Sequence, residues 1–248
     1  MPRLVEVVAD YGPDDLAQAE LRQRLGLAVP GADLQLTTVP YSDTLAAGFC
    51  VARLALTPGP SDRIVAHDVW SDDAAAETWL CAARTRDGVW IVGPNGGFSW
   101  SFVAGRLTAL CHLDVSAGAS RLAPRQGLPL AIGHLARGHP HAISEVVSPE
   151  TVRALPERVV AYVDTTGDIT TTMRELPGAV GERVDVRIGR VSAQATVAAL
   201  DRPVPRGELV LSARDAPPPL VEVVLGGGSA AEHFERPAPG TAVRVGAA

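Results

Sequence analysis

The character of the sequence changes near Ser148, and this change limits the fold to two parts of different class. Before Ser148, strand-like apolar runs alternate with segments whose apolar residues recur at helical spacing. After it, helical spacing largely disappears and short β-rich runs are separated by proline and glycine. We therefore expect an α/β domain over residues 1–148 and a small β-barrel or sandwich over residues 149–248.

Three predicted strands of the first domain end at Asp10, Thr37 and Asp68. In a parallel sheet such ends lie side by side along one edge, where α/β proteins bind their ligands. Asp10 is thus placed to accept hydrogen bonds from two ribose hydroxyls. An equally good alternative is that Asp10 caps the helix predicted over 14–25. Asp43 is expected to cap the helix that follows it.

A short hairpin in the second domain holds two carboxylates close together. A β-rich run ending at Val163 leads to Asp164, a tight turn over 165–167 follows, and Asp168 precedes a run of threonines. Asp and Gly are also common in turns for reasons of backbone geometry alone. An ordinary hairpin and a pair of ligand-binding carboxylates both remain open at this point.

The composition excludes several classes of function. A net charge of −6 without a basic cluster argues against a nucleic-acid partner. The chain has no lysine, which removes Schiff-base catalysis, pyridoxal phosphate attachment and the Walker-A lysine. No G-x-G-x-x-G turn follows the first strand, which disfavours a nicotinamide or nucleotide-sugar enzyme. No apolar run reaches the roughly 20 residues that span a membrane, and no signal peptide precedes the first strand, so we expect a cytoplasmic protein without a membrane partner.

No metal site is expected. Cys50, Cys81 and Cys111 lack metal-ligand spacing and are predicted to be buried free thiols. His139 and His141 form a pair around a proline, a pattern more typical of an exposed loop than of a ligand set.

Four tryptophans occur within one short span: Trp70, Trp79, Trp90 and Trp100. They are consistent with a packing cluster, with an aromatic wall for a planar base, or with a cation-π face for a positive ligand. The glycine-rich turn 93–97, which contains Asn95, would let the backbone approach a ligand closely.

Five segments resemble, in the same order, motifs of the S-adenosylmethionine (SAM) hydroxide adenosyltransferases and of the related SAM-dependent fluorinases and chlorinases. Residues 162–168 (YVDTTGD) resemble the family's "YVDRFGN", and residues 220–232 (LVEVVLGGGSAAE) resemble its "LEIAVNGGSAAE". Residues 8–12 (VADYG) stand where the family has "TTDFG", and residues 94–96 (PNG) where it has "PDNG". Residues 120–138 run parallel to "STFHGRDIFAPAAAHLARG". The resemblance covers nearly the whole chain.

This resemblance implies an α/β fold class with an N-terminal Rossmann-like α/β domain followed by a C-terminal β-barrel domain. It also implies a homotrimer whose ligand lies between the N-terminal domain of one subunit and the C-terminal domain of the next. Enzymes of the family cleave SAM by attack of a nucleophile on the ribose C5′, and methionine leaves. By resemblance, the expected ligand is SAM, as substrate or bound molecule, without a metal.

The matched motifs assign roles to individual residues by resemblance. Asp10 is expected to bind the ribose hydroxyls and Asp164 the methionine ammonium. Asp168 stands in the place of an asparagine that recognises adenine; a carboxylate there accepts from the exocyclic amino group but does not donate to a ring nitrogen unless protonated. Asn95 and Thr166, which lie in two of the motifs, complete this set of expected substrate-binding residues.

Further expected contacts come from loops and from the last apolar run. Tyr41 and Ser42 are placed in the loop that faces the ribose and the nucleophile. Trp70 is expected close to C5′. Val223 and Val224 are expected to line the adenine pocket with their backbone.

The chain departs from the family where water is activated. The hydroxide-transferring members use an Asp-Arg-His set, of which Asp68 remains, whereas the Arg position holds Ala75 and the His position Ala123. The family's "DPGVG" turn is replaced by residues 68–72 (DVWSD), which puts a bulky side chain where a halide or water would sit. We therefore expect neither simple SAM hydrolysis nor halogenation.

Two hypotheses of different class follow. The first is a diverged SAM-dependent enzyme of specialised metabolism that acts at the sulfonium with another nucleophile or a bulkier co-substrate, which the catalytic residue Asp68 orients or deprotonates. The second is a non-catalytic member of the family with a structural or regulatory ligand-binding role.

Overall fold

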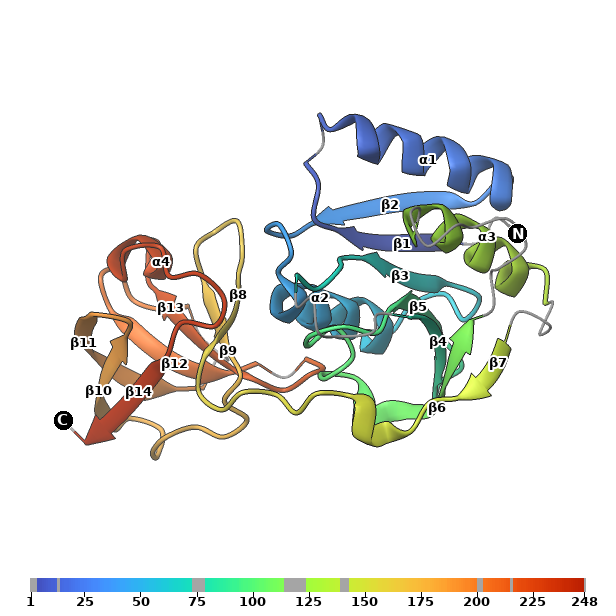
Figure 1. The fold of residues 1–248 in the computed structure, drawn as a ribbon. Coiled ribbons are helices and arrows are strands. Elements are labelled where there is room, and N and C mark those ends of the chain that lie inside the picture. Colours follow the sequence, from blue (N-terminus) through green and yellow to red (C-terminus); the bar gives the residue numbers. More distant parts are fainter. Residues whose placement is uncertain are drawn as a thin grey trace. The chain divides into compact units, whose positions relative to one another are not determined.

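The computed structural model describes residues 4–12, 14–72, 79–113, 124–138, 143–199, 203–214 and 216–247. It is a mixed α/β protein with two seven-stranded sheets (Figure 1). The chain divides into two compact units, Met1–Ala154 and Leu155–Ala248, which we call unit 1 and unit 2. The boundary between the units thus follows Ala154, whereas the sequence pattern placed it after residue 148.

Unit 1 contains a seven-stranded sheet whose strand order in space differs from the strand order in the chain. Its strands are β1 (Leu4–Ala9), β2 (Asp33–Thr38), β3 (Ile64–Asp68), β4 (Leu80–Thr85), β5 (Trp90–Pro94), β6 (Leu107–Leu113) and β7 (Ile143–Val146). Their order is β2-β1-β3-β5-β4-β6-β7. The first four strands in this order are mutually parallel, and β4, β6 and β7 pair antiparallel with their neighbours.

The helices of unit 1 cover both faces of this sheet. They are α1 (Leu16–Ala28), α2 (Thr44–Leu56) and α3 (Pro124–Ala136), with a short 3-10 turn at Ala104–Arg106 and another at Pro149–Thr151. The helices α1 and α3 pack on each other and on one apolar face, to which Val5 and Val7 contribute. The helix α2 packs against β1, β3 and β5, beneath alternate residues such as Val8 and Val65, which are also buried.

Side-chain caps fix where two of these helices begin. The Asp15 carboxylate accepts a hydrogen bond from the Ala17 backbone N–H and caps α1. The Asp43 carboxylate accepts from the Ala46 N–H and caps α2, as predicted. The alternative role of Asp10 as a helix cap is therefore wrong, because Asp15 fills that position.

Unit 2 is built almost entirely of strands. They are β8 (Val160–Val163), β9 (Ile169–Thr171), β10 (Arg183–Ile188), β11 (Val191–Ala198), β12 (Leu209–Ala213), β13 (Val221–Leu225) and β14 (Val243–Ala247), with one short helix, α4 (Ala230–His233). Their order is β14-β10-β11-β12-β13-β9-β8. Among the described strand pairs of this second sheet, only β11 and β12 pair in parallel.

Hydrogen bonds join the two edge strands of this second sheet. Val159, just before β8, forms a bridge with Ala242, just before β14. The Val160 N–H donates to the Thr241 carbonyl over 2.8 Å, and the Val243 N–H donates to the Arg158 carbonyl over 2.7 Å. The sheet therefore curls until its first and last strands meet, and its apolar core lies inside the curl.

Among the described residues, no helix has both the length and the hydropathy needed to cross a membrane.

The turn between β8 and β9 should be sensitive to a side chain at Gly167. Gly167 has φ +87°, and a Cβ atom there would collide with the Ser229 side chain. We expect Gly167→Ala to lower the free energy of unfolding by about 3 kcal/mol, which combines the cost of positive φ with that of the displaced Ser229. Gly207 has φ +81° with nothing within 4 Å of the added Cβ. Gly207→Ala should thus lower the free energy of unfolding by only about 1 kcal/mol. Denaturant titrations of both variants check this, and equal losses would show that the collision with Ser229 costs nothing.

Candidate functional site

The carboxyl ends of the parallel strands of unit 1 bring acidic residues to one edge of the sheet. Ala9, the last residue of β1, pairs with Asp68 of β3 on one side and with Thr38 of β2 on the other. Asp10 follows Ala9 directly. The prediction that these strand ends lie side by side is therefore confirmed, and this edge is where ligands bind in sheets of this kind.

The Asp68 carboxylate is buried and held at both of its oxygens. Its side chain is 1% exposed. The Tyr11 hydroxyl donates to Oδ2 over 2.7 Å, and the Trp70 indole N–H donates to Oδ1 over 2.9 Å. Hydrogen bonds at both oxygens hold the carboxyl group in one orientation.

Tyr11 was missed as a site residue by sequence reasoning. A tyrosine after an apolar strand is typical of core packing. Tyr11 is indeed buried, with 6% of its surface exposed. The available signal was its place in the motif of residues 8–12, where the resembling family has phenylalanine and this chain adds a hydroxyl group.

Ser42 connects the loop after β2 to the loop after β3. Its backbone N–H donates to Asp10 Oδ2 over 3.0 Å, and its hydroxyl donates to the Trp70 carbonyl over 2.9 Å. The same hydroxyl accepts from the Asp72 N–H over 3.2 Å. Ser42 adopts φ 55°, which is uncommon for a residue other than glycine. Four predicted site residues, Asp10, Ser42, Asp68 and Trp70, thus lie in one hydrogen-bonded group.

A cavity of about 130 Å³ adjoins this group on the side of α1. Tyr11 and Asp68 form one wall, and Glu20 and Arg24, which form an exposed ion pair over 3.6 Å, belong to the other. Pockets for whole organic ligands usually have about 300–1,000 Å³. The cavity therefore suits a few water molecules or one small group of a ligand.

The two other predicted residues of unit 1 lie differently. The Tyr41 side chain is 74% exposed. Asn95 is half-buried after β5, and its backbone N–H donates to the Trp79 carbonyl over 2.7 Å. Asn95 shares the carboxyl edge of the sheet with Asp68, because β3 and β5 pair in parallel.

Each of the four tryptophans has a different partner. Trp70 binds Asp68, Trp79 contacts His112 edge to face at 5.6 Å, and Arg84 lies over Trp90 at 5.7 Å. Trp100 is buried in the core and donates to the Pro94 carbonyl over 3.0 Å. The tryptophans thus serve separate packing and hydrogen-bonding roles.

His67 precedes Asp68 but takes no part in acid–base chemistry near neutral pH. Its side chain is fully buried, its ring contacts that of Trp100 at 5.8 Å, and only a glycine at position 93 leaves space for it. Burial lowers the pKa of His67 to about 3, so its imidazole stays neutral.

In unit 2, the turn between β8 and β9 is organised by Asp164. Its Oδ1 atom accepts hydrogen bonds from the Thr166 N–H at 2.9 Å, the Thr166 hydroxyl at 2.7 Å and the Asp168 N–H at 2.9 Å. This is the local backbone role that aspartate commonly has in turns. Among the described residues, no hydrogen bond is directed at Oδ2 of Asp164, so that oxygen is available to a ligand.

Asp168 is half-buried beside a second acidic group. Burial is the main cause that raises the pKa of its carboxyl, and the charge of Asp164 acts in the same direction. The charge of Arg214 and a hydrogen bond with Thr166 oppose this rise. Ionisation of Asp168 is therefore less favourable in the fold than in the unfolded chain.

Arg214 and Glu222 form an ion pair that the sequence analysis did not predict. The Arg214 Nε atom lies 2.8 Å from Glu222 Oε2, and the Glu222 side chain is 6% exposed. The Thr170 hydroxyl lies 3.5 Å from Glu222 Oε1. The signal was a lone carboxylate inside the apolar run 220–225, since a charge in such a run needs a partner when it is buried.

The two predicted valines have different environments. The Val223 side chain is fully buried in the core of unit 2, and Val224 is half-buried. Val223 pairs with Leu211 of β12 and with Ile169 of β9. Their predicted contact with adenine through the backbone stays a prediction.

Within the described part of the chain, no group of three or more His, Cys, Asp or Glu side chains is arranged to hold a metal ion. The predicted exposed loop with His139 and His141 lies outside the described residues, as do Ala75 and Ala123.

Two solved structures resemble this chain over nearly its full length. One is the crystal structure of an uncharacterized conserved protein from Thermotoga maritima, with 19% identity and a TM-score of 0.79, covering 98% of this chain and 100% of that chain. The other is a conserved hypothetical protein from Thermus thermophilus, with 25% identity and a TM-score of 0.72, covering 98% of this chain and 99% of that chain. No protein-family model and no curated protein matches the sequence. These likenesses concern the fold and leave the function open.

The buried hydrogen bond from Tyr11 to Asp68 should contribute measurably to stability. Tyr11→Phe removes the hydroxyl and leaves a buried carboxylate oxygen without that donor, so we expect a loss of about 1.5–3 kcal/mol in the free energy of unfolding. Tyr41→Phe makes the same chemical change at an exposed position and should stay within about 0.5 kcal/mol of wild type. The free energy of unfolding of both variants is measured by denaturant titration. Equal losses in Tyr11→Phe and Tyr41→Phe would show that the hydrogen bond from Tyr11 to Asp68 does not stabilise unit 1.

Because the pKa of Asp168 is raised, replacing this residue by a neutral one should stabilise the fold by an amount that depends on pH. An acid whose folded pKa lies above its unfolded value contributes stability at low pH, and this contribution is lost as the pH rises through the folded pKa. Asp168→Asn should therefore raise the Tm at pH 7, and the gain should shrink as the pH falls toward 3.8, the ordinary pKa of the group. Asp185→Asn, at an exposed position of β10, is the control. A gain that does not depend on pH would contradict the electrostatic explanation.

Proposed function

We propose that this protein is a SAM-binding enzyme that acts at the sulfonium and C5′ centre with a nucleophile other than hydroxide or halide, in specialised metabolism. In this reaction a lone pair of the nucleophile forms a bond to C5′, the C5′–S bond breaks, and its electron pair stays on sulfur in the departing methionine. A protic nucleophile also loses a proton, which Asp68 accepts. Because the sulfonium is already a good leaving group, the protein's task is alignment and the exclusion of water.

One observation carries this proposal: Asp68 is buried at the carboxyl edge of the sheet in a fixed orientation, within one hydrogen-bonded group with Asp10, Ser42 and Trp70. A buried carboxylate costs free energy unless the fold supports it. Here the support comes from Tyr11 and Trp70, two side chains by which this chain differs from the family it resembles. The adjoining cavity has the size of a reacting group and not of a whole nucleoside.

The proposed SAM contacts follow the resemblance. Asp10 accepts from the ribose hydroxyls, and Oδ2 of Asp164 accepts from the methionine ammonium. Asp168 accepts from the adenine amino group, and the backbone of Val223 and Val224 lines the adenine pocket. The three aspartates would each offer an acceptor to a donor that SAM carries.

The proposed architecture is the family's: a Rossmann-like N-terminal domain, a C-terminal β-barrel, and a homotrimer with its sites between subunits. The parallel order β2-β1-β3-β5 supports the first part. The hydrogen bonds between the starts of β8 and β14 support the second.

The alternative is a non-catalytic family member that binds SAM or adenosine in a structural or regulatory role. The hydrogen bonds of Asp68 favour this alternative. Tyr11 and Trp70 engage both oxygens of Asp68 inside the fold, so these oxygens are already used as acceptors. Ala75 and Ala123 also lack the groups that activate water in the resembling enzymes.

The test is a calorimetric titration with SAM, followed by mass spectrometry of the same samples with chloride, a primary amine or a thiol added. Methionine is the product to quantify, because it is released whichever nucleophile attacks. Asp164→Ala should weaken SAM binding by about 10- to 100-fold, since a charged hydrogen bond is lost. Asp68→Asn should bind SAM normally and release no methionine. Asp185→Ala, at an exposed position of β10, serves as the control.

The outcomes separate the two functions. Methionine release that depends on the amine or thiol and on Asp68 supports the enzyme. Binding without release under any condition supports the non-catalytic alternative, and no binding overturns the SAM assignment altogether.

A further inference from the structure

A cavity of about 550 Å³ lies within unit 2, at the end of the β8–β9 hairpin opposite the Asp164 turn. The strand β8 separates the two features by about 13 Å, given about 3.3 Å per residue. None of the residues assigned above to SAM lines this cavity. Its volume falls in the usual range for small-molecule sites, about 300–1,000 Å³.

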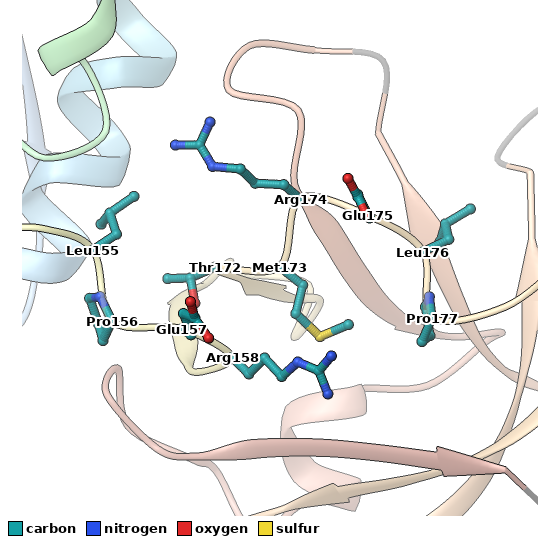
Figure 2. A pocket seen from close by; sticks show the side chains of 10 residues that line it. All are labelled: Leu155, Pro156, Glu157, Arg158, Thr172, Met173, Arg174, Glu175, Leu176 and Pro177. Carbon is teal, nitrogen blue, oxygen red and sulfur yellow. The ribbon is translucent and has the colours of Figure 1, made fainter.

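Two short segments, residues 155–158 before β8 and residues 172–177 after β9, supply all ten lining side chains (Figure 2). Hydrogen bonds hold these segments together: the Val159 N–H donates to the Thr172 hydroxyl over 3.0 Å, and the Thr172 N–H donates to the Val159 carbonyl over 2.9 Å. The two segments are therefore joined to the sheet where they meet, at residues 159 and 172.

Arg158 is held in an unusual backbone conformation at this cavity. Its φ is 50°, in the left-handed region that residues other than glycine seldom adopt. The fold maintains it, because the Arg158 carbonyl accepts the Val243 N–H over 2.7 Å. Backbone strain of this kind gathers at ligand sites, where it directs a side chain.

Each segment contributes one arginine and one glutamate to the lining: Arg158 with Glu157, and Arg174 with Glu175. Among the described residues, no hydrogen bond or ion pair engages the guanidinium of either arginine. Arginine binds carboxylates through two parallel N–H donors, and glutamate binds ammonium groups. The lining thus offers partners for both signs of charge.

The remaining surface of the cavity is largely apolar. Met173, 7% exposed, belongs to its base. Leu155 and Pro156 lie at one end, and Leu176 and Pro177 lie at the other (Figure 2). Polar and apolar groups thus share the surface of the cavity about equally.

We propose that this cavity binds a small zwitterion with an apolar body, of the size of a short peptide. Its carboxylate pairs with Arg158 or Arg174, whose guanidinium groups lie apart (Figure 2), its ammonium pairs with Glu157 or Glu175, and its apolar side chains cover Met173. This site is separate from the proposed SAM site and does not depend on it.

The test uses the full chain and three probes in calorimetric titrations at neutral pH: the dipeptide Leu-Leu, octanoate as an anion only, and octylammonium as a cation only. Leu-Leu should bind most tightly of the three. Arg158→Gln or Arg174→Gln should weaken it by about tenfold or more, since the variant at the partner of the carboxylate removes a charged hydrogen-bond donor. Arg183→Gln, at an exposed position of β10, is the matched control and should leave binding unchanged. SAM titrated into the same variants should give wild-type results.

Failure has distinct forms. No heat with Leu-Leu, or equal binding in Arg158→Gln, Arg174→Gln and Arg183→Gln, overturns the site. Octanoate binding as tightly as Leu-Leu overturns the zwitterion and leaves an anion site. Loss of SAM binding in the arginine variants would show that the cavity is not separate from the SAM site.

Discussion

The burial of the Asp68 carboxylate is the constraint on which the candidate site depends. A charge that is 1% exposed needs donors within the fold, and Tyr11 from the end of β1 and Trp70 from the loop after β3 provide them. Because Trp70 is in turn bonded through its carbonyl to Ser42, the loop before α2 is fixed to the same group. The hydrogen bonds of Asp68 and Trp70 thus connect the segments that follow β1, β2 and β3 at one edge of the sheet.

The sequence predicted this edge better than it predicted the rest of unit 1. The strands β1, β2 and β3 are apolar runs that end in polar residues, and Asp43 marks the start of α2, so local signals sufficed. The strand β4 has the sequence LCAART, with few β-branched residues, and it inserts between β5 and β6, which follow it in the chain. Such an order is decided by tertiary pairing and leaves no local pattern.

Among the candidate site residues, too, some could be predicted from local sequence and others depend on contacts between distant parts of the chain. Asp10, Ser42, Asp68 and Trp70 were predictable because they lie at, or shortly after, the ends of predicted strands. The hydrogen bond of Tyr11 joins residues 57 positions apart, and the ion pair of Arg214 with Glu222 spans two neighbouring strands. Phenylalanine and tyrosine give the same apolar pattern, so only the folded chain identifies what the extra hydroxyl contacts. Likewise, the four tryptophans are close in sequence and yet contact four different groups.

The pairing of Val159 with Ala242 has a consequence for how the chain is made. The strands β8 and β14 meet through the bridge between these two residues, so the ribosome must release residue 242 before the second sheet can join its edges. Unit 1 has its complete set of strands much earlier and can fold while unit 2 is still being synthesised. Contacts between such distant residues also form slowly, because a long loop must first be ordered. Until β14 has been made, the outer edge of β8 has no partner strand, and an unpaired strand edge can pair with another chain.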